Sequence, residues 1–368
     1  AQRGLRVLAI ATGKNQTETE LTILGLIGMA DPPRPEAISA VAAARRAGVH
    51  IVMITGDHAI TAQAIATELG IIADGEDAHE RVHARATPED KLRIVRDWKS
   101  RGAIVAMTGD GVNDAPALRE AHIGIAMGVA GTEVTREAAD MILTDDNFAS
   151  IVDALREGRG IFNNIRKTIT YLLAGNFAEL LVMLIASLFM LPLPLLPLHI
   201  LWINLVTDGL PALALVTDPS DPDVMKQAPR ETSEPLLGKR EWIGVIAIGL
   251  LQALVALAVF VWALQARGLE EARNLAFTTL AFGELFRAFG ARSNDKTIWE
   301  IGFANNMRLL IVVLLSTIAQ IYIHHVPALQ ELLQIGTLSS QDCVLLLFVG
   351  LIPLCVIELW KMLRRTYK

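Results

Sequence analysis

The chain has 368 residues, of which 52% are hydrophobic, and its formal net charge at pH 7 is −6. That negative charge argues against a nucleic-acid partner, because nucleic acids select basic surfaces. The two cysteines, Cys343 and Cys355, fall in the last apolar stretch and form no CxxC pair. This excludes a secreted disulfide framework and a cysteine metal signature.

The first 165 residues have the pattern of an α/β domain. Short apolar runs alternate with helical patterns, which predicts a parallel sheet with helices on both faces. The expected strands are "TILGLIGMA", "VHIVMIT", "AIVAMT", "IGIAMG" and "MILT", and the expected helices cover 35–47, 58–69, 114–121 and 132–139 and begin again at 148. In such sheets the polar site lies at the carboxyl ends of the strands.

Two polar clusters follow expected strands, "MITGDH" at 53–58 and "TGDGVNDAP" at 108–116. Between them, "TPEDKLRIV" places Lys91 near the start of a helix, with Thr87 as N-cap and Asp90 as its capping-box partner. A capping aspartate in a turn would explain one TGD by itself. Two such turns after buried strands, with a lysine between them, indicate a phosphate site.

These residue types suit phosphoryl transfer to a carboxylate. Asp110 and Asp114 are candidate holders of Mg²⁺, which takes carboxylates, waters and phosphate oxygens. The hydroxyl of Thr55 and the two amides after it can donate hydrogen bonds to a transferring phosphoryl group, while Lys91 neutralises its charge.

From about residue 169, apolar blocks alternate with short polar loops. A membrane-spanning helix needs about 20 mostly apolar residues. Six blocks approach that length, at about 169–190, 197–216, 242–264, 272–290, 307–324 and 343–362. Lysine and arginine gather in the loops 218–241 and 287–308 and in the tail, which by the positive-inside rule face the cytoplasm together with the first half. We therefore expect an integral membrane protein, surrounded by lipid.

Oxygen-bearing side chains interrupt the first two apolar blocks. Asn176 and Glu179 are spaced i and i+3, and Asn204, Thr207 and Asp208 are spaced i, i+3 and i+4, so each set is expected on one helix face. A lone asparagine would be explained by an interhelical hydrogen bond. Two carboxylates with no lysine or arginine at the same depth favour a site for a hard cation instead.

Three further features bear on that site. Gly209 and Pro211 should break the second helix and free backbone carbonyls. Glu284 in "AFGELFRAF" is a further candidate ligand, although Arg287 lies one turn away and could simply pair with it. The helix that begins at 148 should run unbroken to about 190, so that a tilt of the first domain would move Asn176 and Glu179.

The motifs "MITGDH", "TPEDKLRIV" and "TGDGVNDAPAL", with "GMADPPRPE" upstream, resemble the phosphorylation domain of P-type ATPases, which belong to the haloacid-dehalogenase superfamily. The resemblance runs over essentially the whole chain. It implies a Rossmann-like, haloacid-dehalogenase-like α/β cytoplasmic domain followed by an all-α six-helix transmembrane domain, with ATP as substrate and Mg²⁺ as cofactor. The implied domains are the end of a nucleotide-binding domain and hinge (1–20), the C-terminal part of the phosphorylation domain (21–165) and the transmembrane domain (166–368).

The same resemblance assigns roles in the first half. It implies Asp110 as Mg²⁺ ligand, Lys91 as phosphate lysine, Thr55, Gly56, Asp57, Asn113 and Asp114 as supports of phosphate and metal, Asp31 and Arg34 at the hinge beside the nucleotide, and Arg6 and Arg85 as nucleotide- or phosphate-side arginines.

In the second half, the patterns N-x-x-E and N-x-x-T-D-G-x-P resemble sarcoplasmic-reticulum-type calcium pumps, bacterial members included. The implied transport ligands are Asn176, Glu179, Asn204, Thr207 and Asp208, with Glu284 as a further one. Sodium/potassium-type pumps have another aspartate in place of Asn204, and secretory-pathway calcium/manganese pumps lack the glutamate. We expect Ca²⁺ transport across a bacterial cell membrane through an aspartyl-phosphate intermediate, with a sodium/potassium- or manganese-type pump as the alternative.

One departure from the family is clear: the string DKTG, whose aspartate is the family's nucleophile, does not occur. We therefore expect this chain to be the C-terminal part of a pump, inactive alone and dependent on the remaining N-terminal part in the same or a separate polypeptide. Two alternatives are a membrane-anchored phosphatase of the dehalogenase superfamily, which would need its own nucleophilic DxD, and a non-catalytic half-pump that regulates a second polypeptide.

Overall fold

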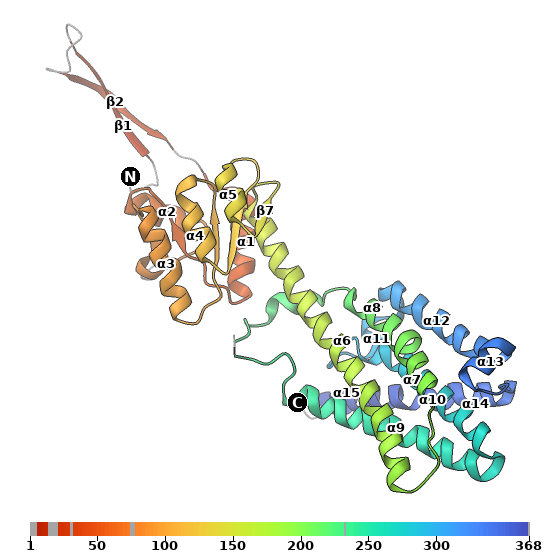
Figure 1. Cartoon of the computed structure of the whole chain (residues 1–368). Coiled ribbons are helices and arrows are strands. Elements are labelled where there is room, and N and C mark those ends of the chain that lie inside the picture. Colours follow the sequence, from red (N-terminus) through yellow and green to blue (C-terminus); the bar gives the residue numbers. More distant parts are fainter. Residues whose placement is uncertain (1–5, 14–20, 30–31, 74–77, 232, 367–368) are drawn as a thin grey trace. The chain divides into compact units, whose positions relative to one another are not determined.

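A computed structural model describes residues 6–13, 21–29, 32–73, 78–231 and 233–366 (Figure 1). The chain divides into two compact units. The first comprises Ala1–Glu157 and Pro222–Glu234, and the second comprises Gly158–Asp221 and Pro235–Lys368. The helix α6 (Phe148–Leu188) contains the boundary between them and is uninterrupted, as the sequence predicted.

The first unit begins with an antiparallel hairpin. β1 (Arg6–Thr12) pairs with β2 (Thr22–Met29), with an irregularity between Ile10 and Ala11. The run "TILGLIGMA" was expected in the parallel sheet, and that expectation is wrong because β2 hydrogen-bonds only to β1. Apolar side chains remain exposed on this hairpin, and Ile23 and Leu26 each have a relative exposure of 70%.

The remaining strands of the first unit are parallel, as predicted. β3 (Met53–Ile54) pairs with β4 (Val82–His83), and β5 (Ala106–Gly109), β6 (Ile123–Met127) and β7 (Met141–Leu143) form a three-stranded sheet in that order. The connecting helices are α1 (Pro35–Arg46), α2 (Ala59–Glu68), α3 (Pro88–Ser100), α4 (Ala115–Glu120) and α5 (Glu133–Ala138), with short helical turns at Ala78–Glu80 and Val112–Asp114. One core cluster joins the two sheets, because Ile54 packs with Val95, Met107 and Leu118.

The capping box predicted at the start of α3 is confirmed. The Thr87 hydroxyl accepts a hydrogen bond from the Asp90 amide at 3.2 Å, and the Asp90 carboxylate accepts one from the Thr87 amide at 3.0 Å. The Thr87 amide and hydroxyl hold the pKa of Asp90 below its usual value. The cap fixes where α3 begins, and so it positions Lys91 in the first turn.

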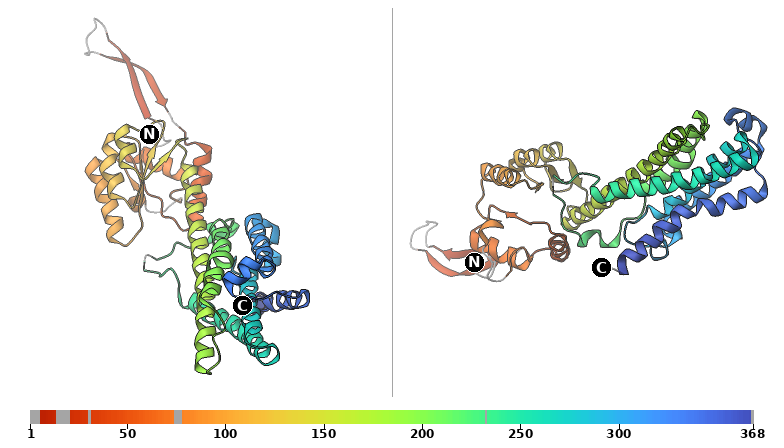
Figure 2. Two further views of the ribbon diagram at one scale, coloured as in Figure 1. Left: turned by 45° about the vertical axis from the view of Figure 1, so that its right-hand side comes forward. Right: turned by 90° about the horizontal axis from the view of Figure 1, so that it is seen from below.

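The second unit is a helical bundle, and its helices lie beside one another in both views of Figure 2. Its elements after α6 are α7 (Pro197–Trp202), the π-helical turn Ile203–Asp208, α8 (Gly209–Val216), α9 (Lys239–Arg267), α10 (Leu269–Gly290), α11 (Ile298–Ile301), α12 (Met307–Tyr322), α13 (Pro327–Leu333), α14 (Ser340–Gly350) and α15 (Ile352–Thr366). α10 packs against α9, α12, α14, α15 and the π-helical turn, so it lies at the centre of the bundle.

Five helical stretches in the described part of the chain are long and apolar enough to cross a membrane. They are Phe148–Leu188, Pro197–Val216, Lys239–Arg267, Phe303–His325 and Ser340–Arg364. The sixth expected span is α10, a helix of 22 residues whose sequence is too polar for it to count among these five. It carries Arg273, Glu284 and Arg287, and its passage through the membrane stays a prediction.

Candidate functional site

The loop after β5 is organised around the carboxylate of Asp114, which is 5% exposed. Its Oδ1 lies 2.5 Å from Lys91 Nζ, and its Oδ2 accepts hydrogen bonds from the amides of Asp110 and Gly111 at 3.3 and 3.2 Å. A side-chain carbon at Gly109 would lie 2.5 Å from the Asp114 Cβ, so the loop needs glycine there. Two segments far apart in sequence, α3 and the TGDGVNDAP loop, are thus held together at one carboxylate.

The residues of the TGDGVNDAP loop fit a magnesium ion. Asp110 and Asn113 are exposed at the carboxyl end of β5. Asp114 already uses both carboxylate oxygens within the protein, so its contribution is to orient Lys91 and the loop amides. The free carboxylate of Asp110 is the hard oxygen ligand that Mg²⁺ takes together with waters and phosphate oxygens.

The second TGD sequence forms a local turn after β3. The Thr55 hydroxyl accepts a hydrogen bond from the Asp57 amide at 3.1 Å and lies 3.2 Å from Asp57 Oδ2, while Gly56 is exposed. The Arg85 amide donates to the Asp57 carbonyl at 3.0 Å, and the Ala86 amide donates to the Thr55 carbonyl at 3.1 Å. This turn therefore lies against the segment that leads into α3 and Lys91.

The expected hinge residues are placed only in part. Arg34 is exposed, and its Nη1 donates to the Asp146 carbonyl at 3.3 Å. The Asp146 carboxylate accepts from the amides of Val129 and Ala130, which hold its pKa below the usual value. Asp31 and the side chain of Arg6 lie outside the described residues.

In the second unit, Glu179 on α6 meets Asn204 of the π-helical turn. Glu179 is 6% exposed, and its two carboxylate oxygens accept from Asn204 Nδ2 at 3.4 and 3.1 Å. Asn204 Nδ2 also donates to the Ile200 carbonyl at 2.9 Å. All three bonds use the amide nitrogen of Asn204, and none uses its amide oxygen.

Two more carboxylates lie beside α6, and both are fully buried. Asp208 Oδ1 and Oδ2 and Glu284 Oε1 have no hydrogen-bond partner, while Glu284 Oε2 accepts from the Thr207 hydroxyl at 3.4 Å. A side-chain carbon at Gly175 would lie 2.6 Å from Asp208 Oδ2 and 3.2 Å from Glu284 Oε1. Two carboxylates from different elements therefore face one point beside Gly175, and their orphaned oxygens call for a ligand, because a buried acceptor left unpaired is costly.

The π-helical turn replaces the expected break in the second span. Pro211 has no N–H, so it cannot satisfy the carbonyls of Val206 and Thr207, which precede it by five and four residues. The Ser316 hydroxyl donates to the Val206 carbonyl at 3.2 Å, and the Tyr171 hydroxyl donates to the Thr207 carbonyl at 3.1 Å. The carbonyls freed by Pro211 are met by neighbouring side chains, and wide turns of this kind are frequent at functional sites.

Asn176 does not join the other candidate ligands. Asn176 is exposed on α6, whereas Glu179, three residues further on, is buried, and the role of Asn176 as a ligand stays a prediction. The reason for the different exposure is the neighbouring helix: the π-helical turn covers α6 at Glu179 and leaves Asn176 uncovered.

Sequence reasoning also missed that a positively charged side chain lies among these carboxylates. Arg287 is 2% exposed, and its Nη2 lies 3.1 Å from the same point beside Gly175 that Asp208 and Glu284 face. The expectation that no lysine or arginine would lie near these carboxylates is therefore wrong. The alternative that Arg287 simply pairs with Glu284 does not hold either, because Glu284 Oε1 and Arg287 Nη2 have no partner.

The described residues contain no group of three or more histidine, cysteine, aspartate or glutamate side chains close enough to hold a metal by themselves. In the second unit, Asn204 and Thr207 place an amide and a hydroxyl group beside the carboxylates of Glu179 and Glu284.

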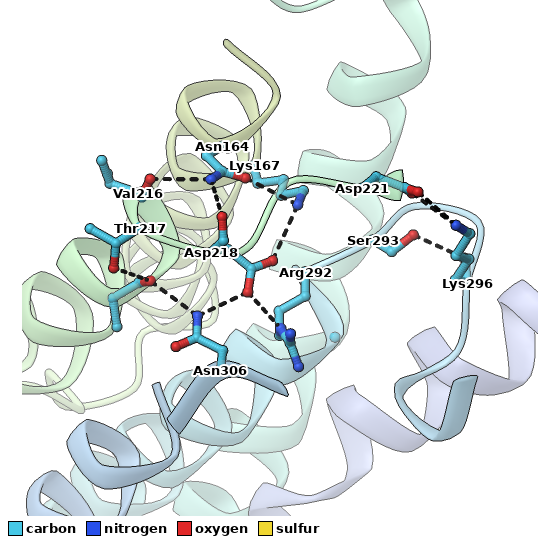
Figure 3. A network of polar contacts seen from close by, with 12 residues as sticks. Asn164, Lys167, Val216, Thr217, Asp218, Asp221, Arg292, Ser293, Lys296 and Asn306 are labelled. Atoms are coloured by element: carbon cyan, nitrogen blue, oxygen red, sulfur yellow. Dashed lines mark hydrogen bonds and ion pairs between the residues drawn. The ribbon is translucent and has the colours of Figure 1, made fainter. Parts of the chain in front are cut away.

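A separate polar network joins the middle of α6 to the ends of three other helical segments (Figure 3). Asp218, just after α8, accepts from Arg292 Nε and Asn306 Nδ2 at 2.9 Å each and from Lys167 Nζ at 3.3 Å. Its carbonyl accepts from Asn164 Nδ2 at 2.6 Å. These residues come from α6, from the segments that follow α8 and α10, and from the start of α12. Charged residues near the ends of the apolar blocks indicate that polar contacts form there, but the sequence does not show which residues pair, because the partners are far apart in the chain.

Comparisons with known proteins agree with this division. Residues 2–122 and 92–155 match families described as haloacid dehalogenase-like hydrolase, and residues 192–363 match the family described as "Cation transporting ATPase, C-terminus". Together with the apolar helices, these matches identify an integral membrane protein with a haloacid dehalogenase-like domain.

Among the curated relatives is "Calcium-transporting ATPase 1" of Bacillus cereus, 40% identical over 410 residues that cover 100% of this chain and 46% of the relative. The "Calcium-transporting ATPase" of Bacillus subtilis is 42% identical over 96% of this chain and 43% of the relative, and "Calcium-transporting ATPase 1" of Saccharomyces cerevisiae is 39% identical over 99% and 42%. The chain spans less than half the length of these relatives. With both units matched in the expected order, the chain belongs to the P-type cation-transporting ATPase family.

Proposed function

We propose that the complete protein containing this chain hydrolyses ATP, passes through an aspartyl phosphate, and uses the cycle to move Ca²⁺ across a bacterial cell membrane. The observation that carries the proposal is the group of buried, unpaired oxygens on Asp208 and Glu284 in a chain that also holds the Lys91–Asp114 pair. The names of the relatives support Ca²⁺ as the ion. Carboxylate, amide and hydroxyl oxygens are the ligands that Ca²⁺ takes.

In the first unit, we assign the handling of the phosphoryl group. Lys91 would neutralise it, the Thr55–Asp57 turn would donate hydrogen bonds to it, and Asp110 would hold Mg²⁺, which stabilises the developing negative charge when bound. Asp114 keeps Lys91 and the Asp110 amide in place through the contacts already described. Arg34 and Arg85 are exposed and suit contacts with nucleotide phosphates.

In the second unit, we assign Glu179, Asn204, Thr207, Asp208 and Glu284 as cation ligands. Asn176 remains a candidate only if another part of the protein covers its exposed face. The nucleophilic aspartate would come from a part of the pump outside the present sequence, in the same or a separate polypeptide. We further propose that the first unit and the C-terminus face the cytoplasm.

The test is ATPase activity of the complete protein in lipid, titrated with Ca²⁺ while Mg²⁺ is held fixed. Activation by micromolar Ca²⁺ is expected, with loss of activation in Glu179→Gln and Asp208→Asn. Glu270→Gln is the matched control, because Glu270 is an exposed carboxylate near the start of α10. Activity that another cation raises and Ca²⁺ does not would overturn the choice of ion, and an unchanged response of Asp208→Asn would overturn the site.

A further inference from the structure

α12 and the short turn Ile323–His325 that continues it carry a stripe of buried polar side chains. Ser316, Gln320 and His324 are spaced four residues apart, and none is more than 1% exposed. The opposite face of α12 is apolar and exposed, as at Leu314 and Ile318. α12 packs against α8, α10 and the π-helical turn, so the stripe lies inside the bundle, although α12 supplies none of the cation ligands assigned above.

Two members of the stripe contact the second span on either side of Asn204. Trp202 Nε1, at the end of α7, donates to Gln320 Oε1 at 2.8 Å. The Ser316 hydroxyl donates to the Val206 carbonyl at 3.2 Å. These contacts lie two residues before and two residues after Asn204, and the other ligands of the turn follow the second contact directly. α12 therefore holds the π-helical turn both before it and within it.

Gln320 is itself held in place from its other side. Because its Oε1 accepts from Trp202, its Nε2 faces His324 Nε2 at 3.5 Å. His324 Nε2 lies 2.9 Å from the Thr278 hydroxyl on α10, and its Nδ1 lies 3.1 Å from the Gly336 carbonyl before α14. The acceptor that Trp202 uses is thus fixed by two other parts of the bundle.

Ser316 provides a donor that the second span lacks. Pro211 lies five residues after Val206, the spacing of hydrogen bonds in a π-helical turn, and it has no N–H to donate. Interhelical hydrogen bonds also join membrane helices without any part in a site. A bond made only for that purpose could end anywhere along the span, whereas this one ends on a carbonyl that Pro211 cannot serve.

We infer that Ser316 and Gln320 are positioning residues for the cation site, through which α12 keeps the second span in its wide turn. This inference rests on the proposed function, because it takes the turn to bind the cation. A wide turn and an ordinary α-helical turn place residues four apart at different angles around the helix. Loss of either contact would therefore change the direction of Asn204 relative to Asp208, without removing any ligand.

The test measures the turn and the cation separately, on the complete protein in lipid. Amide hydrogen exchange without Ca²⁺ reports on residues 203–208, and equilibrium binding of ⁴⁵Ca²⁺ reports the affinity. Ser316→Ala should speed exchange in this turn and weaken Ca²⁺ binding about 2- to 12-fold, the range for one lost hydrogen bond. The maximal ATPase rate at saturating Ca²⁺ should not change, and Ser316→Thr, which keeps the hydroxyl, should restore the affinity. Thr317→Val is the matched control, because the Thr317 hydroxyl donates to the Val313 carbonyl of its own helix at 2.7 Å.

The contact between Trp202 and Gln320 gives a second test that does not depend on Ser316. Trp202→Phe and Gln320→Met should each weaken Ca²⁺ binding over the same range. The double variant should be no weaker than the weaker single variant, because all three lack the same hydrogen bond. This pair decides the question if Ser316→Ala does not match the wild type in elution volume and circular dichroism.

Unchanged exchange in residues 203–208 of folded Ser316→Ala would overturn the inference, and so would faster exchange with unchanged Ca²⁺ affinity. Neither result would affect the proposed function. That proposal fails separately, and the inference with it, if wild type and Asp208→Asn bind Ca²⁺ equally or not at all.

Discussion

Gly175→Ala is the most direct test of the geometry around the buried carboxylates. The added carbon would lie 2.6 Å from Asp208 Oδ2, 3.1 Å from Arg287 Nη2 and 3.2 Å from Glu284 Oε1. Carbon and carboxylate oxygen do not approach to 2.6 Å, so the Asp208 side chain must turn away. The substitution therefore displaces a candidate ligand without removing any charge.

The size of the effect follows from two opposing contributions. Overpacking a close-packed interior by one carbon costs about 1–3 kcal/mol. If the cation requires Asp208 in its present position, that cost falls on the bound state and weakens affinity about 5- to 150-fold. Alanine also favours a helix over glycine by about 0.8–1 kcal/mol, so the stability of α6 should not fall in parallel.

The assay is the Ca²⁺ concentration that half-activates ATP hydrolysis by the complete protein, measured beside its thermal unfolding temperature. Gly158→Ala is the matched control, because Gly158 lies on the same helix and a side-chain carbon there would meet nothing within 4 Å. The control should leave half-activation unchanged. An affinity for Gly175→Ala within about twofold of wild type would refute the placement of Asp208 and Glu284 around this point.

Three further outcomes are expected. Tyr171→Phe keeps the aromatic ring but removes the hydroxyl that lies 3.1 and 3.2 Å from the Thr207 and Glu284 carbonyl oxygens. The Ca²⁺ concentration for half-activation should therefore rise about tenfold, which corresponds to about 1.4 kcal/mol. An unchanged concentration would contradict a role for these hydrogen bonds. Asp218→Ala leaves the charge of Arg292 buried without its carboxylate partner and should lower the free energy of unfolding by about 3–5 kcal/mol, measured by thermal melting. The control Asp153→Ala removes an exposed ion pair with Arg156 and should lower it by less than about 1 kcal/mol. Asp146 has a lowered pKa when folded, so its stabilising contribution is present above the unfolded value of about 3.9 and is lost as pH falls through the lower folded value; the difference in melting temperature between wild type and Asp146→Asn should shrink below about pH 4, and a constant difference would count against it.

Features decided by neighbours in sequence were predictable. The capping box of Thr87 and Asp90 spans three residues, and its partners can be named from the spacing alone. The same is true of the TGD turns and of the five apolar stretches, which depend on local composition. The parallel strands also followed, since alternation of strands and helices leaves few other arrangements.

Features decided by contacts across the chain were not predictable. Tyr171 and Arg287 are 116 positions apart, and no pattern in either helix indicates that Arg287 Nη1 donates a hydrogen bond to the Tyr171 carbonyl. Gln252 is one polar residue in the long apolar run of α9, and its role appears only when α10 packs beside it. The exposure of Asn176 was not predictable for the same reason, because periodicity gives the spacing of two residues on a helix but not how far a neighbouring element covers that face.

α10 combines a polar composition with a central position in the bundle. Its charged residues make it the one expected span that does not meet the apolarity measure, yet it lies at the centre of the bundle, with Glu284 fully buried and Arg287 nearly so. A helix that carries such groups is stable there only if the surrounding helices satisfy them, and Tyr171, Gln252 and Thr207 do so in part. The part left unsatisfied is confined to the oxygens and the nitrogen that face Gly175. The low hydropathy of α10 therefore follows in part from Glu284 and Arg287, the charged side chains that lie beside Gly175 in the proposed cation site.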